Sequence, residues 1–148
     1  MRFHPDFIDF IKALNTHHVD YVIVGAYALA YYGIPRATGD MDFWISPTRE
    51  NAANLLAALR EFGFGELDIG EDDILSERII QLGYPPVRID MLSSLSGLTT
   101  EEIWESRQKA SFAGNDVFII GRDAYIKNKK ATARTKDLAD LELLGESE

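Results

Sequence analysis

The sequence predicts one α/β domain, and three observations lead to this fold class. The chain has 148 residues, the size of a single compact domain. Its hydrophobic and charged fractions, 46% and 26%, are those of globular proteins and exclude a disordered or fibrous chain. Runs with the pattern of strands alternate with segments that have the periodicity of helices. Because no linker or repeat interrupts this order, we expect residues 1–148 to form one domain.

The first half of the chain is predicted to fold as helix, strand, helix, strand and helix. Apolar residues at helical spacing follow Pro5, and the run Tyr21-Val22-Ile23-Val24 has the composition of a buried strand. Gly25 makes a tight turn into an alanine-rich helix that Gly33 closes. Ser46-Pro47 is expected to start the third helix, since proline suits the first helical position. The predicted ranges are 5–17, 21–24, 26–32, 40–45 and 46–62.

The second half is predicted to contain two strand pairs and three helices. The glycine-rich, acidic segment 63–73 is expected to be irregular, and Gly83-Tyr84-Pro85-Pro86 to force a turn between two strands. Thr99 or Thr100 would cap a short helix, and Gly114-Asn115 signals a two-residue hairpin. The predicted strands are 78–82, 87–92, 107–112 and 117–120, and the predicted helices are 98–105, 123–131 and 136–144.

The chain is acidic overall but basic in one segment. Its net charge of -9 discourages non-specific binding to a polyanion and suits a neutral or cationic small substrate. Between Arg122 and Lys136, however, six basic residues accompany one acid, Asp123. This segment is either a local phosphate-binding patch or a solvated helix face.

The residue types and motifs that the sequence lacks exclude several kinds of site. The chain has no cysteine, which excludes disulfides, thiolate zinc sites and a cysteine nucleophile. It also lacks the Gly-Lys-Ser/Thr end of a phosphate loop, the His-Glu-x-x-His zinc motif and the Gly-x-Ser-x-Gly nucleophile motif. Neither an apolar leader nor a membrane-spanning stretch is apparent. We therefore expect a cytoplasmic protein with no membrane partner.

The candidate chemistry centres on three aspartates. Asp40 and Asp42 stand at i and i+2 of a predicted strand, so their carboxylates project from one face while Met41 and Phe43 point to the core. Two like charges held that close repel, and a hard divalent cation such as Mg2+ is the commonest reason to keep both ionised. The alternative is a pair of solvated acids on an edge strand. Asp90, on an otherwise apolar strand, would complete a three-carboxylate site.

A strand-to-helix turn precedes these acids. Val24-Gly25-Ala26 ends one predicted strand and opens the next helix. The N–H groups exposed at the start of a helix bind phosphate oxygens well. This turn would therefore cradle a triphosphate.

Together, these segments resemble the nucleotidyltransferase superfamily of DNA polymerase beta. The similarity is carried, in chain order, by Val24-Gly25-Ala26, Arg36-Ala37-Thr38-Gly39-Asp40-Met41-Asp42-Phe43-Trp44 and Asp90. The run Asn128-Lys129-Lys130-Ala131-Thr132-Ala133-Arg134-Thr135-Lys136-Asp137-Leu138-Ala139-Asp140-Leu141 resembles the closing motif of small bacterial nucleotidyltransferases akin to AbiEii toxins. The resemblance implies a minimal nucleotidyltransferase fold, a short mixed sheet backed by helices with the acids at one end of the sheet, and a toxin-antitoxin-like context.

The resemblance also implies a role for each acid. Asp40 and Asp42 would bind the metal pair that carries a nucleoside triphosphate such as ATP. Asp90 would hold the metal that activates the acceptor hydroxyl and would assist as a general base. The implied cofactors are two Mg2+ ions, with Mn2+ as a substitute. The implied reaction moves a nucleoside monophosphate to a hydroxyl and releases pyrophosphate.

Further residues are implied to bind the nucleotide near the turn. Gly25 would let the backbone approach the phosphates, and Ala26 would donate its N–H. The superfamily usually has Gly-Gly or Gly-Ser here, so the alanine is expected to weaken nucleotide binding. Arg36 and Thr38 are expected either to fix the loop before the acids or to contact the substrate.

The basic segment supplies the remaining implied residues. Lys129, Arg134 and Lys136 would neutralise phosphate charge, and Asp137 would position one of these cations or contact the acceptor. The alternative for all four is an ion-paired terminal helix.

The acceptor stays open at this stage. A small cationic molecule agrees with the acidic remainder of the chain, whereas a transfer RNA end or a protein side chain agrees with the basic segment and the AbiEii-like motif. A homodimer or a partner subunit would build the acceptor side of so small a domain. The rival interpretations are a catalytically idle nucleotide-binding or regulatory module on the same fold, and a plain structural domain.

Overall fold

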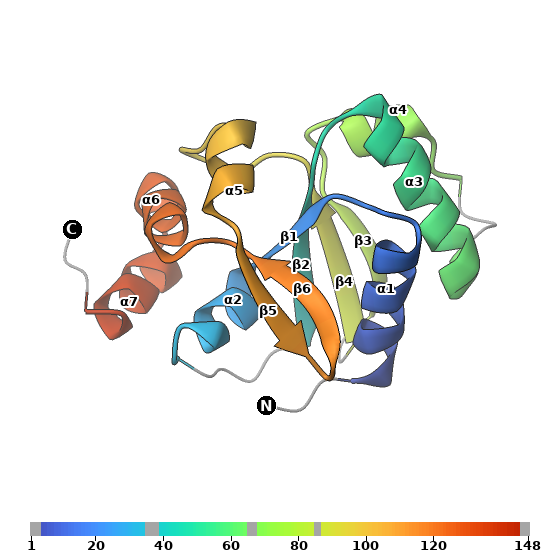
Figure 1. Ribbon diagram of the computed structural model, residues 1–148. Coiled ribbons are helices and arrows are strands. Elements are labelled where there is room, and N and C mark those ends of the chain that lie inside the picture. Colours follow the sequence, from blue (N-terminus) through green and yellow to red (C-terminus); the bar gives the residue numbers. More distant parts are fainter. Residues whose placement is uncertain (1–3, 35–38, 65–67, 85–86, 146–148) are drawn as a thin grey trace.

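A six-stranded mixed sheet lies at the centre of the computed structural model, which describes residues 4–34, 39–64, 68–84 and 87–145 (Figure 1). The strands follow the order β3-β4-β2-β1-β6-β5. β1 pairs antiparallel with β2 and parallel with β6, while β2 pairs parallel with β4. The outer strands β3 and β5 are antiparallel to their neighbours. The strands are β1 (Tyr21–Val24), β2 (Asp40–Ile45), β3 (Ile80–Tyr84), β4 (Val87–Leu92), β5 (Gln108–Phe112) and β6 (Asn115–Ile119).

Helices flank this sheet on two sides. The helical elements are α1 (Pro5–Thr16), α2 (Gly25–Tyr31), α3 (Arg49–Leu59), the π-helical turn η1 (Arg60–Phe64), α4 (Glu71–Leu75), α5 (Thr100–Ser106), α6 (Arg122–Thr132) and α7 (Thr135–Leu143). Figure 1 shows α1 and α3 to one side of the sheet and α2, α6 and α7 to the other. α1 packs against α3, β4 and β6, and α6 packs against α5 and α7. The predicted fold class, a short mixed sheet backed by helices, is confirmed.

The face of β2 toward α1 belongs to the hydrophobic core. Met41, Phe43 and Ile45 are all buried, as the alternation of the strand predicts. The ring of Phe43 packs edge-on against Phe10 of α1, with ring centroids 5.1 Å apart. This packing holds β2 in the orientation that turns its aspartates to the opposite face.

The opposite face of β2 is also closed at one end, by Trp44. This side chain is fully buried, although it shares its face with the aspartates. Its Nε1–H donates to the carbonyl of Ser93 at 3.2 Å, and its ring lies beside that of Trp104 on α5. The aspartates therefore occupy an open part of a face that is otherwise covered.

One helix prediction was wrong at its start, and one segment that was predicted to be irregular is partly helical. α3 begins at Arg49, because the Oγ1 of Thr48 accepts a hydrogen bond from the N–H of Asn51 and caps the helix there; Ser46-Pro47 stays outside. The segment 63–73 is not wholly irregular, since its first two residues belong to η1 and α4 begins at Glu71. Residues 65–67 of this segment lie outside the described residues. The carboxylate of Asp73 accepts a hydrogen bond from the N–H of Gly70 at 2.8 Å, and acidic residues in the first turn suit the helix dipole.

The strand predicted over 78–82 is shifted toward its turn. β3 runs to Tyr84, because Gly83 and Tyr84 continue the ladder opposite Arg88 and Val87. Gly83 has a φ of +78°, and a Cβ there would overlap the carbonyl of Val87, so glycine is needed within the strand. Residues 85–86 of the predicted turn lie outside the described residues.

The predicted hairpin has its loop one residue earlier than expected. Phe112 pairs with Asn115, so the two-residue loop is Ala113-Gly114, and Asn115 begins β6. Both loop residues have positive φ, 50° and 81°, as a type I′ turn requires. The side-chain amide of Asn115 donates to the carbonyls of Phe112 and Ala113 and holds the loop from the strand side.

None of the helices in the described part of the chain combines the length and apolar character that crossing a lipid bilayer requires.

Asn51 joins α3 to the sheet. Its side chain is almost fully buried, at 3% exposed. The amide donates to the carbonyls of Asp20 and Ser46, both at 2.9 Å, and its Oδ1 accepts from the N–H of Asp20 at 2.7 Å. One side chain thus satisfies the backbone just before β1 and just after β2.

We predict that Asn51→Ala destabilises the fold by about 2–3 kcal/mol, because it removes three partly buried hydrogen bonds between this side chain and the backbone of Asp20 and Ser46. Urea unfolding followed by circular dichroism measures this loss. Asn54→Ala on the same helix is the matched control and should change the free energy of unfolding by less than about 0.5 kcal/mol. Equal effects of the two substitutions would contradict a special role of Asn51.

Candidate active site

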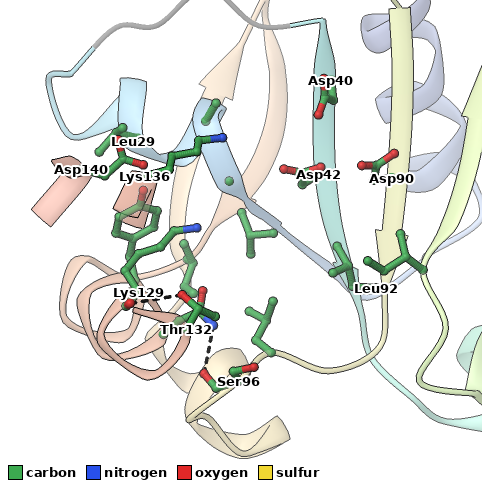
Figure 2. Close-up of a pocket in the computed structure, with 18 of the residues that line it drawn as sticks. Leu29, Asp40, Asp42, Asp90, Leu92, Ser96, Lys129, Thr132, Lys136 and Asp140 are labelled. Atoms are coloured by element: carbon green, nitrogen blue, oxygen red, sulfur yellow. Dashed lines mark hydrogen bonds between the residues drawn. The ribbon is translucent and has the colours of Figure 1, made fainter. Parts of the chain in front are cut away.

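Three aspartate side chains meet on the open face of the sheet. Asp40 and Asp42 come from β2 and Asp90 from β4, where Asp42 and Asp90 are register partners. One carboxylate oxygen of each lies within 4.8 Å of those of the other two. Figure 2 shows Asp42 and Asp90 side by side, with Asp40 farther along β2. The sequence placed the acids at one end of the sheet, whereas Asp42 and Asp90 stand at interior positions of their strands.

The environment of Asp42 disfavours the ionised form of its carboxyl group. Burial raises the pKa of its carboxyl to about 7, and the charges of Asp90 and Asp40 act in the same direction, while the ammonium of Lys129 opposes them. Asp42 is therefore only partly ionised near neutral pH when no cation is bound. A divalent cation among three carboxylates would favour the ionised form, and the all-oxygen ligand set is the type that Mg2+ or Mn2+ takes. The residues fit such a group.

Arg88 neutralises part of this cluster and was not among the predicted site residues. Its Nε and Nη2 donate to the two oxygens of Asp90 at 2.9 and 3.0 Å, and Nη2 also donates to Asp40 Oδ2 at 2.9 Å. One feature of the sequence could have predicted this role of Arg88. It precedes Asp90 by two residues, so both side chains leave the same face of β4. The pairing of Arg88 with Asp40 across the strands needs the register, which the sequence does not show.

Gly25 makes room for Asp42. It connects β1 directly to α2 with a φ of +70°, and a Cβ at this position would overlap Oδ2 of Asp42. Val24 and Asp42 are register partners, which explains why the junction comes so close to the carboxylate. Glycine is thus required to seat Asp42. Both Gly25 and Ala26 line the cavity in front of the acids, where their predicted contact with phosphates stays a prediction.

A basic wall faces the acids. Lys129, Arg134 and Lys136 line the same cavity as the aspartates. Figure 2 shows Lys129 and Lys136 directing their ammonium groups across the cavity toward β2. The side chain of Lys129 is only 13% exposed, and this burial lowers the pKa of its ammonium. The structure therefore brings together the three predicted cations and the three predicted acids.

Asp137 lies behind this wall. It is fully buried and is not among the cavity-lining residues. Its Oδ2 accepts from Nε of Arg134 at 2.8 Å and from Oγ1 of Thr132, and Nζ of Lys129 lies 3.6 Å from Oδ1. Burial alone would raise the pKa of Asp137, but the hydrogen bonds from Arg134 and Thr132 and the charge of Lys129 outweigh it and lower the pKa. This geometry favours the predicted positioning of cations over contact with the acceptor.

The cavity between the two walls has a volume of about 430 Å3, enough for a nucleotide-sized ligand. Two of its lining residues were missed by sequence reasoning. Asn128 of α6 donates to the carbonyl of Ser96 at 2.9 Å and fixes the basic wall to the segment after β4. Asp140 is buried and adds negative charge near Lys129. The sequence feature that could have predicted this position is its spacing: Asp140 follows Asp137 by three residues, about one turn along α7.

Arg36 and Thr38, which were also predicted to belong to the site, lie outside the described residues.

The raised pKa of Asp42 predicts a dependence of stability on pH in the metal-free protein. The unfolded chain ionises Asp42 near pH 4, whereas the folded protein does so only near pH 7, so the folded state loses stability as pH rises between these values. Asp42→Asn removes this loss. In EDTA, the variant should therefore be more stable than wild type by about 2 kcal/mol at pH 8, with the gain disappearing toward pH 4.

Urea unfolding at the two pH values measures this difference. Asp9→Asn, which alters an exposed carboxyl on α1, is the control and should change stability by less than about 0.5 kcal/mol at either pH. A gain from Asp42→Asn that is equally large at pH 4 and pH 8 would contradict the electrostatic origin.

Two solved structures are similar to this chain in fold. TM1012 of Thermotoga maritima, assigned as a nucleotidyltransferase, is 13% identical, with a TM-score of 0.59 over 97% of this chain and 93% of its own. The antibiotic-resistance factor ANT(2'')-Ia is 17% identical, with a TM-score of 0.61 over 95% of this chain and 80% of its own. At such identities the likeness shows a shared fold.

Comparison of the sequence with known proteins and protein families adds to this structural similarity. A search of curated proteins found no match. A family model described as "Nucleotidyl transferase of unknown function (DUF2204)" matches residues 4–147. The predictions of a nucleotidyltransferase and of an enzyme are therefore confirmed. Because the match spans nearly the whole chain, the protein belongs to this nucleotidyltransferase family.

Proposed function

We propose that the protein is a Mg2+-dependent nucleotidyltransferase that moves a nucleoside monophosphate from a nucleoside triphosphate to a hydroxyl group and releases pyrophosphate. One observation carries this proposal. Three carboxylates on β2 and β4 face three cationic side chains, from α6, α7 and the connection between these helices, across one cavity. A metal-bound triphosphate, which presents cations and phosphates side by side, matches both walls.

The carboxylates of Asp40, Asp42 and Asp90 would hold the ions, with Mn2+ able to replace Mg2+. When bound, such ions neutralise phosphate charge and lower the pKa of a bound hydroxyl. Asp42 is the register partner of Asp90 and stands two residues from Asp40 on the same strand face, and the charges of both act on it, so we propose it as the ligand on which the site depends most. Gly25 keeps the space that the Asp42 carboxylate needs.

The cationic wall and the α2 junction would hold the phosphates. Lys129 and Lys136 direct ammonium groups into the cavity, and Asp137 fixes the guanidinium of Arg134 at its edge. Charges that are already oriented need little reorganisation when the substrate binds. The N–H groups of Gly25 and Ala26 stand at the same cavity and would donate to phosphate oxygens.

The transfer itself exchanges one phosphorus–oxygen bond for another. The acceptor oxygen forms a bond to the α-phosphorus, the bond from this phosphorus to the bridging oxygen breaks, and pyrophosphate leaves with that oxygen. The proton of the acceptor hydroxyl passes to a carboxylate of the cluster, for which we propose Asp90, which lies on the far side of Asp42 from Lys129 and Lys136.

The acceptor belongs to one of three classes: a small molecule, a transfer RNA end or a protein. Incubation with each labelled nucleoside triphosphate, Mg2+ and a fractionated cell lysate identifies the class by the fraction that gains label. Fractions labelled by wild type and not by Asp42→Asn support transfer. Nucleotide binding without pyrophosphate release in any fraction would favour the idle module instead.

We predict that the two kinds of acid variant fail differently. Asp90→Asn should still bind Mg2+ and nucleotide but transfer at least about 100-fold more slowly, because it loses the carboxylate on the acceptor side. Asp42→Asn should lose metal-dependent nucleotide binding as well as transfer. Isothermal titration and pyrophosphate release measure the two steps separately. If wild type and Asp90→Asn bind nucleotide equally and neither releases pyrophosphate, the proposal that the protein catalyses transfer is contradicted.

We further predict that Lys136→Ala weakens nucleoside triphosphate binding by about three- to tenfold and leaves the fold intact, because an exposed ammonium at the cavity is replaced. Lys130→Ala removes an equal charge from α6 at a position outside the cavity lining and is the matched control. Titration at constant ionic strength distinguishes them. Equal losses of nucleotide affinity in both variants would indicate a general effect of net charge. They would support the alternative interpretation of the basic segment, a solvated helix face.

A further inference from the structure

Arg88 holds the carboxylate oxygens that the ions would need. Both oxygens of Asp90 and one oxygen of Asp40 accept hydrogen bonds from its guanidinium at 2.9–3.0 Å. This bidentate, charge-assisted geometry is among the strongest that a carboxylate makes in a protein. The described structure therefore has a cation of its own at two of the three acids.

The strand register builds this contact into the fold. Arg88 is the partner of Asp40 across β2 and β4, and it shares a strand face with Asp90 two residues later. A side chain as long as arginine can reach both acids from this position without any change of backbone. The contact is thus a property of the sheet and not of a mobile segment.

We propose that Arg88 is a built-in counter-ion, which occupies Asp40 and Asp90 in the metal-free enzyme and competes with the divalent ions for these carboxylates. This inference rests on the metal site of the proposed function, but not on the transfer reaction. Arg88 stabilises the crowded acids before substrate arrives and reduces the affinity of the site for ions alone. The side chain lines the cavity and is 28% exposed, so it has room to withdraw when the ions enter.

Competition follows from the charges. A guanidinium and a divalent cation at the same oxygens repel each other, so an ion that binds these oxygens must displace Arg88 from them. Phosphate is the other group that a guanidinium binds in a bidentate manner, so an arriving triphosphate offers Arg88 a new partner in the same cavity. Ion binding in the wild type is thereby tied to the presence of the nucleotide.

The test is a titration of the metal-free protein with Mn2+ in the absence of nucleotide, followed by electron paramagnetic resonance. Arg88→Gln should bind Mn2+ at least roughly tenfold more tightly than wild type, because the competing charge is gone. Arg88→Lys, which keeps the charge but cannot bridge two carboxylates bidentately, should fall between them. Arg78→Gln removes an equal charge from an exposed arginine bound to Asp73 and should stay within about twofold of wild type.

Thermal unfolding supplies a second readout. In EDTA, Arg88→Gln should melt at a lower temperature than wild type, because three crowded carboxylates lose their counter-ion. Added Mn2+ should raise its melting temperature by more than it raises that of wild type. If Arg88→Gln is unfolded in EDTA, Arg88→Lys carries the same comparison of Mn2+ affinities.

The outcomes separate the inference from the proposed function. Tighter Mn2+ binding by the Arg88 variants supports the counter-ion whether or not wild type shows transfer. Equal or weaker binding by both variants would overturn it, because Arg88 would then support the metal site and not compete with it. A failure of every protein to bind Mn2+ would overturn the metal site and the counter-ion together.

Discussion

The site depends on the in-register parallel pairing of β2 with β4. In a parallel pair, register partners point to the same face of the sheet and are separated by the spacing of adjacent strands. The pairing of β2 with β4 therefore holds the carboxylates of Asp42 and Asp90 close together. Their repulsion is a cost that the rest of the site offsets. Gly25 leaves space for the Asp42 carboxylate, Arg88 binds Asp90, and Lys129 faces Asp42 across the cavity. The raised pKa of Asp42 shows that the compensation is incomplete without a further cation.

The hydrophobic core sets this register. Met41 and Phe43 are buried against the α1 side of β2, and a slip of one residue would exchange them with the aspartates on either side. Such a slip would bury unpaired carboxylates and expose an aromatic ring, which costs far more than any single hydrogen bond. The packing of Phe43 against Phe10 therefore positions the acids on the other face. Core and site are two faces of one strand, and neither can shift without the other.

Local patterns predicted the parts of this arrangement that are local. The strand over 40–45 and its buried residues follow from alternation, and both acids of that strand follow from a period of two. The contact between Arg88 and Asp40 joins residues 48 positions apart and depends on the register of two strands, so no local pattern contains it. The start of α3 was missed because proline and threonine both suit helix starts, and only the hydrogen bond to Thr48 decides between them. The burial of Asp137 depends on how α6 and α7 pack, which the charge of the segment does not show.

The two walls of the cavity make the proposed metal and nucleotide sites thermodynamically dependent on each other. Without ligand, the acids are balanced by Arg88 from within the sheet and by Lys129 from across the cavity. Ions alone would meet the opposition of these cations, and a triphosphate alone would meet the repulsion of the acids. Each ligand removes the charge that opposes the other, so each must raise the affinity for the other by the same factor. An enzyme built this way assembles its complete charge set only when metal and nucleotide are both present, which keeps the reactive arrangement from forming with either one alone.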